Sequence, residues 1–141
     1  MPKFHIEAFS DSSRQKVFGL FAGFENYQKL FPQYFPSVRI LSIRNEVSVV
    51  EEHLILGQRE LVMMTKHIVE GQNKHDVFVI GGDAKGTHIV ELFESTKNGT
   101  QITINVDFRL RGNMKIANAL GRFDVEKEYK NLVEEFLNCL N

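Results

Sequence analysis

Histidine and glutamate side chains are the groups in this sequence that could carry acid–base chemistry. An imidazole exchanges protons near neutral pH, and a neighbouring carboxylate can hold it in the orientation that proton transfer needs. His53, His67 and Glu91 lie in segments with the alternating pattern of β-strands. Such residues could serve general acid–base catalysis, or they could orient a bound ligand in a mostly apolar pocket.

Other kinds of site are not indicated. The histidines do not fall into a compact metal-ligand spacing such as HExxH, and Cys139 has no partner cysteine. The glycine-rich segment 81–87 lacks the pattern of a phosphate-binding loop, because Thr87 rather than a lysine follows Gly86 and a strand rather than a helix comes next. We therefore expect no metal and no cofactor.

Strands account for most of the predicted structure and must position the polar groups. Apolar and polar residues alternate over 3–9, and turn-forming residues divide the chain from Pro36 to Arg111 into six further strands. We expect these at 38–44, 47–56, 60–70, 75–80, 87–96 and 101–110. The connections are too short for a crossover helix, so successive strands pair antiparallel.

Helices are predicted before and after these six strands. Two short helices follow the first strand; the first ends near Gly23, and the second covers 26–30 and ends before Pro32. After Gly112, apolar residues recur at helical spacing to the end of the chain, with Gly121 as a bend. We expect one long helix over 113–140 that lies across the sheet.

The composition fits a single globular domain over residues 1–141, with 43% hydrophobic and 25% charged side chains. Lys and Arg number 17 against 18 Asp and Glu, and without clustered basic charge we expect no nucleic-acid partner. The first residues lack the features of a secretory signal, and no stretch approaches the roughly 20 apolar residues of a membrane span. We expect a cytosolic protein that is a monomer or a weak homodimer.

The whole chain resembles one protein family in the order of its elements. One strand, two short helices, six antiparallel strands and a terminal helix are the elements of the START-like (SRPBCC) superfamily, which includes birch-pollen-allergen type proteins. The stretch 24–32 (FENYQKLFP), followed by 38–41, is similar to the passage from second helix to second strand in polyketide cyclases and coenzyme Q-binding START proteins. Residues 6–18 resemble the first strand and helix of the family.

This resemblance implies an α+β helix-grip fold, in which a seven-stranded curved antiparallel sheet has the C-terminal helix packed across its concave face. It also implies an apolar cavity between sheet and helix that holds lipids, quinones, polyketides or other hydrophobic molecules. The last strand is compatible with this, because one of its faces is entirely apolar and suits the concave side. That face carries Ile102, Ile104, Val106, Phe108 and Leu110.

The register of the last two strands decides whether Glu91 faces the cavity, and two registers fit the sequence. With a two-residue turn at 98–99, Glu91 opposes Val106 and faces inward. With a three-residue loop at 97–99 the register slips by one residue, which turns Glu91 outward and brings His88 in. An inward carboxylate would need a partner or a raised pKa.

The predicted ligand contacts combine polar groups with the apolar face. His53 and His67 are the candidates for orienting the ligand, and the alternative is that they are hydrogen-bonded sheet histidines without a binding role. The predicted ligand-binding residues are His53, His67, Glu91, Phe93, Ile104, Val106, Phe108, Ile116, Leu120 and Phe123.

Aromatic residues are unevenly distributed along the chain. It has 12 Phe and 3 Tyr but no Trp, and many of the rings fall between residues 18 and 35. Most of these rings should pack in the core. Phe24, Tyr27 and Phe31 are predicted to form the cavity entrance, or else an exposed patch that touches a membrane transiently.

Three functions are compatible with these features. The first is non-catalytic binding of a hydrophobic small molecule (a quinone, isoprenoid, lipid or polyketide-like compound) for carriage or sensing. The second is an enzyme of the polyketide cyclase or dehydratase type, which needs a pocket histidine within hydrogen-bond reach of Glu91. The third is a protein-interaction module for a chaperone or a ribosome, which needs a filled core. The first is preferred because the sequence has no compact catalytic motif.

Overall fold

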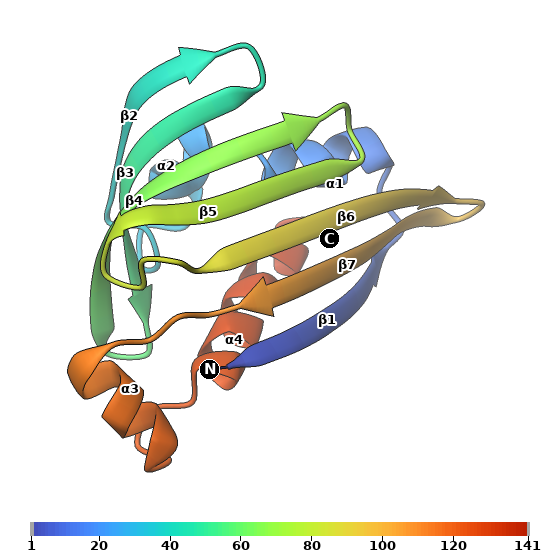
Figure 1. Cartoon of the computed structure of the whole chain (residues 1–141). Coiled ribbons are helices and arrows are strands. Elements are labelled where there is room, and N and C mark those ends of the chain that lie inside the picture. Colours follow the sequence, from blue (N-terminus) through green and yellow to red (C-terminus); the bar gives the residue numbers. More distant parts are fainter. Residues whose placement is uncertain (1, 141) are drawn as a thin grey trace.

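The computed structural model describes residues 2–140, which form one sheet and the helices around it (Figure 1). The strands are β1 (Lys3–Ser10), β2 (Ser37–Arg44), β3 (Val47–Leu56), β4 (Arg59–Glu70), β5 (Lys74–Gly82), β6 (His88–Thr96) and β7 (Gly99–Asp107). The helices are α1 (Arg14–Phe21), the 3-10 helix η1 (Phe24–Asn26), α2 (Tyr27–Leu30), α3 (Gly112–Ala119) and α4 (Val125–Asn138). Within these residues, no helix is long and apolar enough to cross a membrane.

The strands form one antiparallel sheet in the order β1-β7-β6-β5-β4-β3-β2. In β3, every second residue from Ser48 to Leu56 is buried, which marks the concave face of the sheet. The sheet curves around α4, as Figure 1 shows. The buried stripe of α4 consists of Val125, Tyr129, Leu132, Val133 and Phe136. The predicted α+β helix-grip architecture is confirmed.

The hairpin between β6 and β7 has neither of the two predicted registers. Its turn covers residues 97–98, and Glu91 pairs with Ile104 rather than with Val106. The pairing predicted with a two-residue turn at 98–99 is therefore wrong by two residues, and the alternative register that turns Glu91 outward is also wrong. Because side chains alternate along a strand with a period of two, this shift leaves Glu91 on the concave face, where it is buried.

The C-terminal segment forms two helices rather than one. The chain turns after α3 at Gly121, whose φ of 75° lies in the left-handed region that glycine tolerates. Asp124 then caps α4 by accepting a hydrogen bond from the Lys127 backbone N–H at 3.1 Å. The expected single helix over 113–140 is therefore wrong, and α3 projects away from the sheet (Figure 1).

Several of the aromatic residues between 18 and 35 pack against α4. The Phe136 ring is stacked on the Phe31 ring at a centroid distance of 4.1 Å and meets the Tyr27 ring edge-on at 5.4 Å. Phe24, Tyr27 and Phe31 are all buried. The alternative of an exposed aromatic patch is therefore wrong, because Tyr27 and Phe31 pack on α4 and Phe24 is stacked on His67 of β4.

Candidate functional site

Four adjacent strands each place one ionisable side chain on the concave face of the sheet. These residues are Glu52 on β3, His67 on β4, His75 on β5 and Glu91 on β6. Their side chains are between 0% and 8% exposed. We refer to these four residues as the Glu–His array.

The Glu–His array is a continuous chain of hydrogen bonds. His67 Nε2 lies 3.3 Å from Glu52 Oε2, and His67 Nδ1 lies 2.8 Å from His75 Nε2. His75 Nδ1 in turn lies 2.6 Å from Glu91 Oε1, and these two residues are directly opposite each other in the β5–β6 ladder. The array thus links two carboxylates through two imidazoles. Within residues 2–140, no group of three or more His, Cys, Asp or Glu side chains is placed to hold a metal ion.

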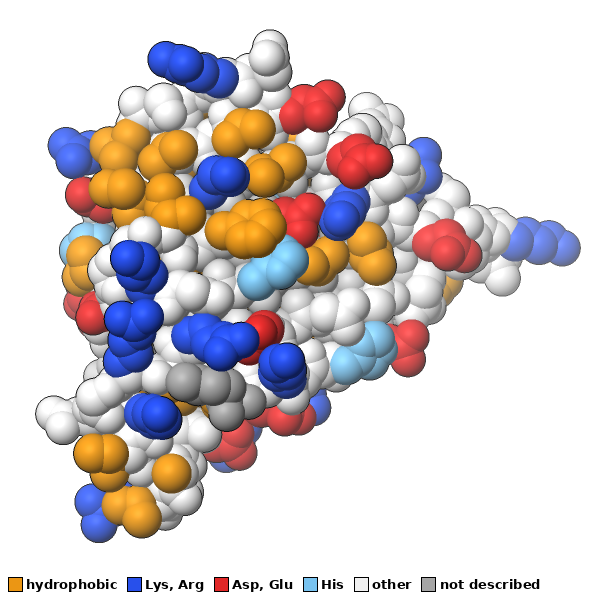
Figure 2. All heavy atoms as spheres, in the orientation of Figure 1, with side chains coloured by type: hydrophobic (Ala, Val, Ile, Leu, Met, Phe, Trp, Pro, Cys, Tyr) orange, Lys and Arg blue, Asp and Glu red, His pale blue; other side chains and the backbone are white. Residues whose placement is uncertain are grey.

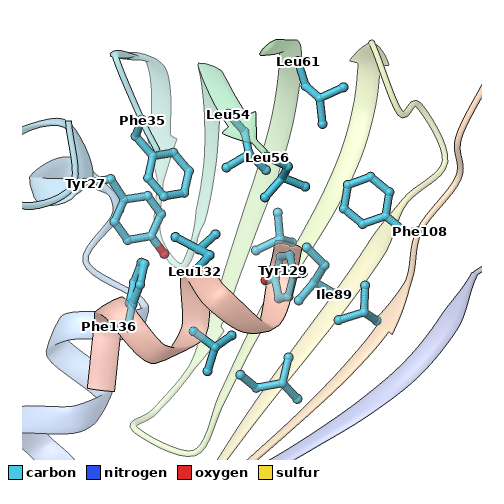
Figure 3. Close-up of a cluster of buried hydrophobic side chains, with 14 of the residues drawn as sticks. Tyr27, Phe35, Leu54, Leu56, Leu61, Ile89, Phe108, Tyr129, Leu132 and Phe136 are labelled. Atoms are coloured by element: carbon cyan, nitrogen blue, oxygen red, sulfur yellow. The ribbon is translucent and has the colours of Figure 1, made fainter. Parts of the chain in front are cut away.

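A small cavity lies between the Glu–His array and α4. Its wall is mostly apolar, and Figure 3 shows side chains converging on it from the sheet and from α4. The apolar part of the wall includes Phe35, Leu54, Ile89, Phe108, Leu132 and Phe136. Glu52, His67 and Glu91 supply the ionisable groups. The cavity volume is about 50 Å³, which is far below the roughly 300–1,000 Å³ of pockets for drug-sized ligands.

Two buried tyrosines, Tyr27 and Tyr129, also line the cavity. Burial, and after it the charges of Glu91 and Glu52, raises the pKa of both hydroxyls well above its ordinary value. Both hydroxyls therefore keep their protons at neutral pH. The Tyr27 hydroxyl donates a hydrogen bond to the backbone carbonyl of Phe21.

An outer groove lies on the other side of His67. It has a volume of about 250 Å³, and its wall includes Gly23, Phe24, Ser48 and Val69. The Phe24 ring is stacked on the His67 ring at a centroid distance of 4.5 Å. His67 therefore borders both the cavity and the groove, and Phe24 covers it on the groove side.

The structure brings part of the predicted site to the cavity wall. His67, Glu91 and Phe108 line the cavity, together with Tyr27 from the predicted entrance. Phe24 lines the outer groove instead. The other buried members of the predicted set pack in the core outside the cavity wall; these are Phe31, Phe93, Ile104, Val106 and Phe123.

Three of the predicted ligand contacts lie away from the cavity. The pleat of β3 turns His53 to the convex face, where its Nδ1 lies 2.7 Å from Glu60 Oε2. Ile116 and Leu120 are 58% and 60% exposed, because α3 turns away from the sheet. The structure therefore corrects their expected position.

Two members of the Glu–His array, Glu52 and His75, are not among the predicted ligand contacts. The alternation contained a signal for them, since Glu52 shares its face of β3 with Leu54 and Leu56, and His75 shares its face of β5 with Val77. The signal is weak because the opposite face of β3 is also partly apolar. Only packing against α4 settles which face is concave.

Comparison with known proteins finds similarity in structure rather than in sequence. No protein-family model matches the chain, and no curated protein matches it. Among solved structures, the protein TTHA0849 from Thermus thermophilus has a TM-score of 0.81 and 16% identity, covering 99% of this chain and 94% of that chain.

Two further solved structures that resemble this chain are a member of a named superfamily and an enzyme. A START superfamily protein from Mycobacterium smegmatis has a TM-score of 0.75 and 13% identity, covering 98% of this chain and 96% of that chain. The Zhui aromatase/cyclase from Streptomyces sp. R1128 has a TM-score of 0.72 and 14% identity, covering 97% of this chain and 93% of that chain. At such low identity, these likenesses concern the fold.

Proposed function

We propose that this chain, which has the helix-grip fold of the START-like (SRPBCC) superfamily, binds a hydrophobic small molecule between the sheet and α4. The apolar wall would hold the body of the ligand, and the Glu–His array would bind its polar group, a division of roles typical of small-molecule pockets. Quinones, isoprenoids, lipids and polyketide-like compounds are the proposed classes, for carriage or sensing in the cytosol.

The observation that carries this proposal is the burial of four ionisable groups beside an apolar cavity. Taking charged groups out of water costs free energy, and well-packed apolar residues in their place are often equally stable or more stable. Folding stability alone therefore gives little reason to keep the Glu–His array in the core. A ligand that contacts the array explains its place at the cavity wall.

Binding requires the cavity to expand. Its volume of about 50 Å³ is less than the roughly 150 Å³ that holds a benzene molecule in an engineered apolar cavity. Met63 lies in the wall and has a flexible side chain that can take other rotamers. We expect a ligand to displace Met63 and to shift α4, which is joined to α3 by residues 120–124.

Phe24 is proposed as the gate between the outer groove and the cavity. Rotation of its ring away from His67 would open a route beside that imidazole. Phe24→Ala should therefore speed both association and release of a ligand in stopped-flow measurements. Phe18→Ala is the matched control, because Phe18 lines the same groove but packs on Phe93. Equal rates in the two variants would contradict the gate.

A second candidate function is acid–base catalysis on the bound molecule, of the cyclase or dehydratase type. The observation in its favour is the contact of 2.6 Å between His75 Nδ1 and Glu91 Oε1, which reaches the cavity through Glu91. An imidazole paired with a carboxylate can accept and return a proton. One structural neighbour is an aromatase/cyclase, which is compatible with this candidate.

Extraction of the purified protein into organic solvent, followed by mass spectrometry, tests the binding proposal. We expect a hydrophobic small molecule to co-purify, or members of a hydrophobic ligand panel to bind in calorimetry. Two neighbouring substitutions on β3 give a matched control. Leu54→Phe fills the cavity, whereas Ile55→Phe adds the same volume on the convex face. Binding should be lost in the first variant and kept in the second.

The binding proposal fails if no ligand co-purifies and no member of the panel binds, and such a protein would fit the interaction module better. It also fails if the Leu54→Phe and Ile55→Phe variants bind equally well. The catalytic candidate needs turnover of a polyketide-like substrate that is lost in Glu91→Gln and kept in Glu60→Gln, since Glu60 pairs with His53 outside the cavity.

A further inference from the structure

The hydrogen bonds of the Glu–His array fix the number of protons that it holds. Each of its three contacts joins an imidazole nitrogen to another nitrogen or to a carboxylate oxygen, and each needs one proton between its two atoms. Two neutral imidazoles and two ionised carboxylates supply only two protons. An array in which all three contacts are hydrogen bonds holds one additional proton, and its two negative charges are then reduced to a net charge of minus one.

This remaining negative charge has no basic partner at the cavity. Neither Lys nor Arg is among the described residues that line it. Each carboxylate uses one oxygen in the array, and within residues 2–140 the other oxygens of Glu52 and Glu91 accept no hydrogen bond. Glu52 and Glu91 both line the cavity, so two hydrogen-bond acceptor oxygens and one uncompensated negative charge face a mostly apolar space.

We infer that the polar group of the ligand is a protonated amine, an inference that rests on the proposed function and narrows its ligand class. An ammonium group donates hydrogen bonds and carries the positive charge that neutralises the Glu–His array. Aromatic rings in the cavity wall, among them Tyr129 and Phe108, add cation–π attraction. An alcohol donates a hydrogen bond but leaves the charge uncompensated, and a carboxylate adds a second negative charge.

Three probes with the same body test this inference. Benzylamine, benzyl alcohol and benzoate differ in the charge and donor capacity of one substituent, and titration against ¹⁵N-labelled protein at neutral pH gives their affinities by NMR. Benzylamine should bind at least about tenfold more tightly than benzoate, because the ammonium compensates the negative charge of the Glu–His array and a second carboxylate is repelled by it. Benzyl alcohol should lie between the two.

Variants that lack one carboxylate then test whether the preference for benzylamine depends on the Glu–His array. Glu91→Gln and Glu52→Gln each replace one carboxylate acceptor of the Glu–His array by a neutral amide, and either should weaken the preference for benzylamine, because a hydrogen bond from the ammonium to a neutral oxygen is weaker than one to a carboxylate. Two variants are used so that a loss of folding in one, seen by circular dichroism, leaves the other to decide. Glu60→Gln removes the carboxylate bonded to His53 on the convex face and should keep the full preference.

The outcomes separate this inference from the proposed function. Equal affinities for the three probes, or tighter binding of benzoate, would overturn the amine inference and leave small-molecule binding in place. A preference that is undiminished in both array variants would also overturn it. If members of the hydrophobic ligand panel bind but none of the three probes does, the amine inference alone is overturned. If neither the panel nor the probes bind, the proposed function itself is contradicted.

The proton count has a direct test that needs no ligand. NMR spectra correlating the side-chain nitrogens and protons of His67 and His75 report which ring nitrogens are protonated. Three of the four should carry protons, because an imidazole nitrogen is more basic than a carboxylate oxygen. If neither His67 Nδ1 nor His75 Nε2 carries a proton, the contact between the two rings lacks its proton, and the inferred charge would be wrong.

Discussion

The two faces of the sheet carry the same kind of ion pair in different surroundings. On the concave face, His75 and Glu91 are 0% and 8% exposed. On the convex face, His53 and Glu60 are 28% and 51% exposed, at a similar N–O distance of 2.7 Å. Figure 2 shows the convex face, where charged and apolar side chains are mixed. Burial rather than the chemistry of the pair decides its role, because water competes for the exposed groups.

Adjacent residues of one strand can therefore have opposite roles. Glu52 points inward and joins the Glu–His array, whereas His53 points outward and pairs with Glu60 at the surface. On the concave face, His75 and Glu91 are buried, so hydrogen bonds to water cannot replace the one between them. The convex pair can break and reform with little change in free energy, since water replaces each partner.

The largest expected loss of unfolding free energy comes from breaking the pair of His75 and Glu91 on the concave face. His75→Ala removes both hydrogen bonds of a fully buried imidazole and leaves Glu91 without its partner. Removal of one partner from a buried pair costs about 3–5 kcal/mol of unfolding free energy. His53→Ala should cost only about 0–1 kcal/mol, as is usual for exposed pairs. Urea unfolding at neutral pH measures both.

A similar loss of unfolding free energy in the two histidine variants would remove the distinction between the faces. The control for lost side-chain volume is His75→Phe combined with Glu91→Leu, which replaces both partners by apolar groups. This double variant should be more stable than His75→Ala, because no unpaired charge remains buried.

A smaller effect on the free energy of unfolding is expected from the ionisation of Tyr129 at high pH. Burial, and then the charges of Glu91 and Glu52, raises the pKa of Tyr129 at the cavity well above its ordinary value. Between about pH 10 and that higher pKa, the unfolded chain releases a proton that the folded chain keeps, so stability falls as pH rises by up to about 1.4 kcal/mol per pH unit. Tyr129→Phe should remove this contribution.

Tyr34 gives the comparison outside the cavity. Its pKa is also raised, first by partial burial and then by Glu135 and Glu128, but less strongly than that of Tyr129. Tyr34→Phe should therefore flatten the pH dependence of unfolding less than Tyr129→Phe does. Urea unfolding at several values from roughly pH 9 to pH 11, with tyrosinate absorbance as a second probe, distinguishes them. An unchanged slope in Tyr129→Phe would contradict the assignment.

The fold was predictable because strand alternation is a local signal. The strand expected at 47–56 has the observed bounds, and the one expected at 38–44 differs from β2 by one residue. The break in the C-terminal helix was not predictable from spacing alone. Helical periodicity continues across Gly121, and only its left-handed backbone and the cap at Asp124 show that a second helix begins.

The candidate site was only partly predictable, because its polar members depend on contacts between distant strands. His67 was expected to orient a ligand, and Glu91 faces inward in one of the two expected registers; both line the cavity. His75 could not be paired with either of them before the strand order and register were known. Glu52 and His53 are neighbours in the sequence, and packing against α4 decides which of them faces the cavity.

The smallest expected effect is that of salt on the coupling energies of the two pairs, His53–Glu60 and His75–Glu91. In double-mutant cycles at about pH 6, the coupling between His53 and Glu60 should be about 0.2–1 kcal/mol. It should fall toward zero at about 1 M salt, because exposed charges are screened. The coupling between His75 and Glu91 should be about 0.5–3 kcal/mol and keep its value, because ions do not reach a buried pair. Alanine at each histidine and glutamine at each glutamate complete the cycles. Equal salt sensitivity of the two couplings would mean that solvent reaches the Glu–His array.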